Sequence, residues 1–185
     1  MNVVLKFVLL FTIFTLHLEQ REYFAEAYIK LTNAICKSFD EKFAIFKSCR
    51  LYVYRRREIS FTMHVRLFQT PVRNISVNLS LWRKANTFQP FLYNVTVDFC
   101  KFLKRRYSPP LRIVYEALFK TSNINHTCPF DHDIILDRFV PNDGMFRLLP
   151  LPGGQYMFKF LTDVNNERKT DVRVEISIDL DSKYN

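Results

Sequence analysis

Strict alternation of apolar and polar residues is the feature that most limits the folds open to this chain. It is plainest from Val172 to Leu180, and it recurs from Ile59 to Leu67 and from Ile75 to Leu81. Successive side chains of a strand point to opposite faces, so each run predicts a strand with one dry and one wet face. The pattern recurs less cleanly at residues 156–160, and residues 28–36 and 49–54 are plausible strands as well. Together they predict an antiparallel β-sandwich.

One segment follows a helical period instead. Apolar residues recur at i, i+3, i+4, i+7 and i+8, at Leu111, Val114, Tyr115, Leu118 and Phe119, which is one stripe of an amphipathic helix. Ser108 stands where an N-cap residue is expected, and the prolines that follow it suit a first turn. A shorter helix is expected at residues 98–103. The sandwich should therefore carry a short helical insert around residues 97–121.

The N-terminus predicts export. Residues 7–16 are apolar except for two threonines, and a lysine precedes them. That run is shorter than the roughly 20 residues that span a bilayer, and it fits a signal-peptide core. Ala25 and Ala27 provide a small-x-small cleavage site. We expect a signal peptide at residues 1–27 and one extracellular domain at residues 28–185, although an uncleaved signal anchor remains an alternative.

Cysteines and glycosylation sequons agree with secretion. An even number of cysteines in an exported chain predicts two disulfides, with three connectivities open. We favour Cys36–Cys49 and Cys100–Cys128, because each bond closes a short loop. The sequence N-x-[ST], which marks a glycosylation site, occurs at Asn74, Asn78, Asn94 and Asn125.

Catalysis is not expected. The chain has three glycines, too few and too late for the glycine-rich loops of dinucleotide enzymes and P-loop NTPases or for the nucleophile elbow of α/β-hydrolases. The histidines His64, His126 and His132 lie beside no recognisable nucleophile. Asp131-His132-Asp133 is interpreted as a surface loop, so neither a metal nor another cofactor is expected.

Charge and aromatic content leave alternatives open. The formal net charge is +9, but no nucleic-acid-binding motif accompanies it, so no nucleic acid is expected as a partner. The basic clusters at residues 55–57 and 101–106 are either solvated turns or sites for a polar or anionic head group. The 19 Phe and 9 Tyr residues fit either a packed aromatic core or an apolar ligand cavity.

Three segments resemble the signatures of an insect family of small, secreted, four-cysteine proteins of unknown function. They are Pro90–Leu103 (PFLYNVTVDFCKFL), Ser122–Phe130 (SNINHTCPF) and Leu149–Tyr156 (LPLPGGQY). The early cysteine context Thr32–Cys36 also fits. That family is similar to the ML, or ganglioside-activator-like, lipid-recognition domains and to the CheB-type chemosensory proteins of flies.

The resemblance implies an immunoglobulin-like, ML-like β-sandwich whose sheets part to admit a lipid, and it implies no catalytic residue. It also supports the Cys100–Cys128 pairing. Strand alternation and the helical stripe then select the residues expected to line the ligand site: Phe61, Met63, Val65, Phe99, Leu118, Phe119, Phe158 and Phe160.

The function expected from the sequence is binding of a hydrophobic small molecule or lipid by a secreted, monomeric glycoprotein. Chemosensation or extracellular lipid recognition would be its setting, with a membrane receptor as a further partner. The alternative is an extracellular protein-interaction or signalling module with a filled core and no ligand.

Overall fold

The computed structural model describes residues 28–56, 58–141, 144 and 151–179. The predicted signal peptide lies outside the described residues. In chain order the elements are β1 (Tyr28–Ser38), β2 (Ala44–Arg55), β3 (Glu58–Leu67), β4 (Ile75–Lys84), β5 (Phe88–Asp98), α2 (Phe99–Arg105), α3 (Pro109–Leu118), the 3-10 helix η1 (Phe119–Thr121), β6 (Ile134–Phe139), β7 (Gly154–Val164) and β8 (Glu167–Asp179).

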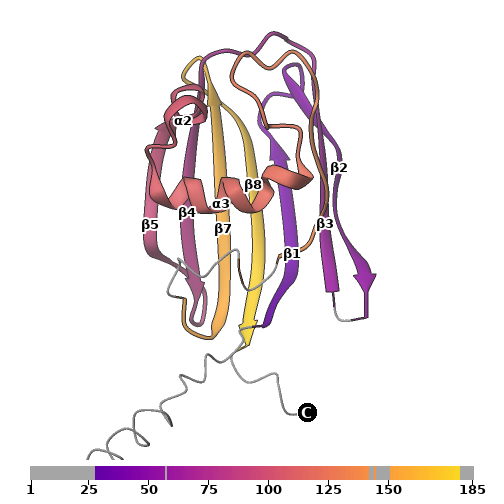
Figure 1. Ribbon diagram of the computed structural model, residues 1–185, viewed down its shortest axis with the longest axis vertical. Coiled ribbons are helices and arrows are strands. Elements are labelled where there is room, and N and C mark those ends of the chain that lie inside the picture. Colours follow the sequence, from indigo (N-terminus) through magenta and orange to yellow (C-terminus); the bar gives the residue numbers. More distant parts are fainter. Residues whose placement is uncertain (1–27, 57, 142–143, 145–150, 180–185) are drawn as a thin grey trace, which may run out of the picture.

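The strands form two antiparallel sheets. The larger has the order β1-β8-β7-β4-β5, and the smaller has the order β2-β3-β6. In Figure 1 the larger sheet runs from β5 at the left to β1, and β2 and β3 stand beside β1 at the right. Apolar residues on the inner faces of both sheets form one buried cluster, as expected when two amphipathic sheets pack face to face. The predicted fold class, an immunoglobulin-like antiparallel β-sandwich, is confirmed.

The first disulfide connects the two sheets. Cys36 of β1 is bonded to Cys49 of β2, and these strands belong to different sheets. The predicted pairing is therefore correct. The bond joins the edge strand of the large sheet to the edge strand of the small one, so it fixes the two sheets along one side of the sandwich.

The helical insert closes the other side. In Figure 1, α3 crosses the view of β4, β7 and β8, and its residues share a cavity with those strands. Asp98 caps α2, because its carboxylate accepts a hydrogen bond from the backbone N–H of Lys101 at 2.9 Å. Ser108 occupies the N-cap position of α3, but its side chain makes no capping hydrogen bond. The expected insert is confirmed, and the expected Ser108 cap bond is not formed.

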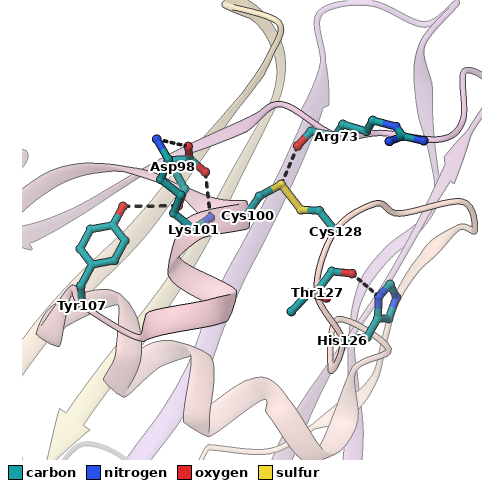
Figure 2. Close-up of a disulfide and its surroundings, with 8 residues drawn as sticks. All are labelled: Arg73, Asp98, Cys100, Lys101, Tyr107, His126, Thr127 and Cys128. Carbon is teal, nitrogen blue, oxygen red and sulfur yellow. Dashed lines mark hydrogen bonds and ion pairs between the residues drawn. A yellow bond between two sulfur atoms is a disulfide. The ribbon is translucent and has the colours of Figure 1, made fainter.

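The second disulfide fastens this insert. Cys100, in the first turn of α2, is bonded to Cys128 in the loop before β6, again as predicted. Figure 2 shows the surroundings of this bond. The sulfur of Cys100 lies 2.6 Å from the backbone oxygen of Arg73, in the segment between β3 and β4. The first turn of α2, the loop before β6 and the segment before β4 therefore meet at one point.

Two strands were not predicted from the alternation, and each has a local cause. β5 contains Pro90, and its pairing with β4 shifts register between Ser80 and Trp82. Leu92 adopts a left-handed backbone with φ of 56°, and such an irregularity interrupts a period of two. β6 is only six residues long and begins with three consecutive apolar residues, which no alternating pattern would select.

Candidate functional site

An apolar cavity lies between the two sheets and α3. Its volume is about 260 Å³. The large sheet contributes Leu31, Ile75, Val77, Phe158, Phe160, Thr162, Val164, Lys169, Thr170, Val172, Val174 and Ile176 to the lining. The small sheet contributes Ala44, Phe46, Phe61, Met63, Val65, Leu67, Ile134, Leu136 and Phe139. The helices and loops contribute Phe43, Val72, Phe99, Leu111, Val114, Tyr115, Ala117, Leu118, Ile124, Phe130 and Pro141.

The inner faces of paired strands supply most of this wall. Phe158 lies opposite Val174, and Phe160 lies opposite Val172, in the register between β7 and β8. The valines are only half-buried although β8 is an inner strand of the sheet. Side chains that border a hollow keep accessible surface in this way, whereas those of a filled core do not.

Seven of the eight residues expected to line a ligand site do line the cavity. β3 provides Phe61, Met63 and Val65, because these alternate residues all point to its inner face. The other four are Phe99 of α2, Leu118 of α3, and Phe158 and Phe160 of β7. Their position is observed, and their role as ligand contacts stays a prediction.

Phe119 is the exception, and its expected place in the lining is wrong. Its side chain is 40% exposed and rests on Tyr115, with ring centroids 5.7 Å apart. The buried face of α3 extends toward Ala117. At about 100° per residue, Ala117 and Phe119 lie on opposite flanks of the stripe. The helix packs with its Ala117 flank inward, which leaves Phe119 outside.

The cavity has one polar end, which the sequence pattern did not predict. Thr162, Lys169 and Thr170 line it where β7 ends and β8 begins. Thr162 lies opposite Thr170 and Asp163 lies opposite Arg168, so Lys169 is an extra residue without a partner across the pair. Such a β-bulge changes the direction of a side chain. It explains how a lysine in a polar run comes to border an apolar cavity.

Lys169 is buried, with 7% of its surface exposed, and it is paired with two carboxylates. Its Nζ lies 2.8 Å from Oδ2 of Asp40 and 2.7 Å from Oε2 of Glu167. These hydrogen bonds raise the pKa of Lys169, and the bond to Lys169 lowers the pKa of Asp40. Two carboxylates and one ammonium leave this group of three with a net charge of −1 at neutral pH.

The pairing of Asp40 predicts an acid-sensitive contribution to stability. Because the pKa of Asp40 is lowered in the folded state, its contribution is complete above the ordinary value of about 3.9 and is lost as pH falls through the lowered value. Asp40→Asn should lower the melting temperature at pH 7, and the difference from wild type should narrow as pH falls below about 4. Thermal unfolding measured from neutral to strongly acidic pH tests this prediction. Asp131→Asn, at an exposed position, is the control. The prediction is contradicted if the difference in melting temperature between Asp40→Asn and wild type is as large in strong acid as at pH 7.

The basic clusters do not border the cavity. Within the described part of the chain, neither Arg55 and Arg56 nor the basic residues of positions 101–106 are among its lining. Arg106 instead stacks on Tyr115, with the guanidinium carbon 3.8 Å from the ring centroid. Among the described residues, Lys169 is the only basic side chain that lines the cavity.

Each of the three described histidines makes polar contacts with neighbouring residues. His64 is paired rather than simply exposed, because its Nε2 lies 2.7 Å from Oδ2 of Asp133, and this contact lowers the pKa of Asp133. The Nε2 atoms of His126 and His132 are 2.7 Å apart, and His126 also appears in Figure 2, bonded to the backbone oxygen of Thr127 at 2.7 Å. In the described residues, no three His, Cys, Asp or Glu side chains form a group that could hold a metal ion.

The sequons lie outside the cavity. Asn78 of β4 and Asn94 of β5 are neighbours, because the amide nitrogen of Asn78 donates to Oδ1 of Asn94 at 2.9 Å. Asn74 and Asn125 are in loops. None of the four asparagines lines the cavity. Their glycosylation stays a prediction.

These features define a class: a β-sandwich with an apolar cavity between its sheets. Residues 77–158 match the family described as "Protein of unknown function (DUF1091)", which is less than half of the chain. No curated protein sequence matches. Among solved structures, a Niemann-Pick type C2 protein from the Japanese carpenter ant is similar at 14% identity and a TM-score of 0.30, over 80% of this chain and 89% of that one. The insect four-cysteine family and the CheB-type relationship stay predictions.

Among the described helices, none has the length and apolar character needed to cross a membrane.

Proposed function

We propose that this chain is a secreted glycoprotein that binds a hydrophobic small molecule or lipid between its two sheets. The observation that carries the proposal is the cavity of about 260 Å³ lined almost entirely by hydrocarbon side chains. Ligand pockets are typically apolar, with few polar groups and volumes of about 300–1,000 Å³. The cavity lies just below that range, which suits a guest with one hydrocarbon chain or a small ring system.

Transfer of apolar surface from water would drive binding. At about 25 cal/mol per Å², a guest that buries roughly 300 Å² gains on the order of 7 kcal/mol before the costs of association. The wall is fixed by the two disulfides, so little ordering is needed when the guest enters. A preformed site of this kind keeps a larger share of the gross gain.

An extracellular setting is part of the proposal. Two disulfides are typical of oxidising compartments, and the predicted signal peptide and sequons point the same way. We place the activity in extracellular lipid recognition or chemosensation, with the protein acting as a monomer and a membrane receptor as a further partner. No catalytic role is proposed.

The alternative function is an extracellular interaction module with a filled core. One observation favours an interaction surface: Tyr52, Val53 and Tyr54 of β2 are exposed, Val53 to 80%. The two proposed functions predict different packing of the core. A filled module predicts tight packing between the sheets, whereas the described core contains a cavity, and so binding of a guest is preferred.

Native mass spectrometry of the secreted, deglycosylated protein tests the proposal. We expect a co-purifying apolar molecule that is released on denaturation, or stoichiometric uptake of an added fluorescent fatty alcohol or sterol. Val174→Phe should reduce uptake at least about tenfold, ~1.4 kcal/mol, because the larger side chain occupies the cavity. Val53→Phe makes the same change at an exposed position and should bind as wild type does. A bare mass with no uptake by the wild type refutes the proposal.

A further inference from the structure

The polar end of the cavity gives the guest an orientation and restricts its chemistry. Thr162 and Thr170 are opposite each other on β7 and β8, and both line the cavity. Neither hydroxyl has a hydrogen-bond partner within the described part of the chain. They are not sealed off either, because the fully buried side-chain polar atoms that lack a partner there are Nη1 of Arg106 and Oγ of Ser122. Two side chains whose hydroxyls can donate and accept therefore border the space that a guest would occupy.

The charge next to these hydroxyls decides which head group fits. Lys169 borders the same end, but Asp40 and Glu167 already bind its ammonium. The group of three carries a net charge of −1, so it offers an anion no unpaired cation and repels it instead. Burial of a carboxylate without a partner is costly, whereas a neutral oxygen needs only the hydrogen bonds that the threonines can make.

The rest of the wall, as far as the described residues form it, offers no second polar anchor. Apart from the three residues of this end, Tyr115 is the described lining residue with a polar side-chain group, and its hydroxyl donates to the backbone oxygen of Ile124 at 3.0 Å. A guest with one polar end gains hydrogen bonds in only one orientation. Its apolar part then lies against Phe158, Val174 and the inner face of β3.

We propose that the cavity selects apolar molecules that end in one neutral oxygen function, such as an alcohol, aldehyde, ketone or ester, and that Thr162 and Thr170 bind this oxygen. Fatty-acid anions of the same chain length are disfavoured. This inference rests on the proposed function, because it names the class of guest for the same cavity.

The test compares three probes with the same carbon chain: dodecan-1-ol, dodecanoate and dodecane. Each displaces an apolar fluorophore from the full secreted protein at pH 8, where the acid is ionised. We expect the alcohol to bind at least about tenfold more tightly than the carboxylate, ~1.4 kcal/mol, and several-fold more tightly than dodecane.

Variants assign the preference to the threonines. In Thr162→Val/Thr170→Val the shape is kept and the hydroxyls are lost, so dodecanol should bind about tenfold more weakly, ~1.4 kcal/mol, while dodecane binding is unchanged. Thr162→Ser/Thr170→Ser keeps the hydroxyls and should retain the preference. Thr32→Val, at an exposed position of β1, is the matched control and should behave as wild type.

The outcomes distinguish the proposed head-group preference from the proposed binding function on which it rests. If dodecane and dodecanoate bind as tightly as dodecanol, or if the double valine variant keeps the preference, the head-group assignment is wrong and apolar binding stands. If the fluorophore and all three probes fail to bind a folded wild-type protein, the proposed function itself is refuted, and the assignment with it.

Discussion

Replacing Leu118 with arginine is expected to abolish uptake of apolar ligands. Leu118 is the last residue of α3 and lines the cavity. A guanidinium there either enters an apolar space without a partner or pulls the end of the helix outward to reach water. Both results interrupt the apolar wall of the cavity. We expect uptake to fall about a hundredfold or more, ~2.7 kcal/mol, as measured by titration of a fluorescent fatty alcohol or sterol.

The neighbouring residue provides the matched control. Phe119→Arg introduces the same charge one position along, on a side chain that is 40% exposed and does not line the cavity, and it should leave uptake unchanged. Leu118→Ala keeps the wall apolar and should retain binding, which separates the effect of charge from the loss of leucine. Equal uptake by Leu118→Arg and wild type, with both proteins folded by circular dichroism, would show that α3 is not a wall of the ligand site.

The contrast between Leu118 and Phe119 shows how much of the helix could be predicted from the sequence. The stripe predicts which residues share a face, but it does not say which flank packs inward. Ala117 carries little hydrophobic signal, yet it is buried and lines the cavity. Packing of the helix, rather than its pattern, decided between the two flanks.

Strand alternation was more informative, because the period of two fixes the face of each residue. It placed Phe61, Met63 and Val65 on one inner face, and the structure has them there. The same reasoning failed wherever the ladder is irregular. Pro90 and Leu92 interrupt β5, and Lys169 faces the cavity only because of a bulge opposite Thr162 and Asp163. The polar run that contains Lys169 gives no local sign of a bulge, since the extra residue is defined by its pairing with β7.

Loss of the Cys100–Cys128 disulfide is expected to destabilise the folded protein strongly. The bond spans 28 positions, and in the chain-entropy model a loop of this length contributes about 3.5 kcal/mol. The double variant Cys100→Ala/Cys128→Ala should therefore unfold at clearly lower denaturant concentration. The measurement is equilibrium unfolding in urea, with the change in free energy taken at constant slope.

Comparison with a variant that lacks the Cys36–Cys49 bond tests ligand binding as well as stability. It spans 13 positions, so Cys36→Ala/Cys49→Ala should cost nearly as much, about 3 kcal/mol. However, it joins two sheets, whereas Cys100–Cys128 holds the segments that carry Phe99, Ile124 and Phe130 against the cavity. At a temperature where both variants are folded, the Cys100/Cys128 variant should bind apolar ligand more weakly than the Cys36/Cys49 variant. Equal affinities would mean that the helical side of the cavity keeps its shape without the bond, and that packing of α3 alone maintains the wall.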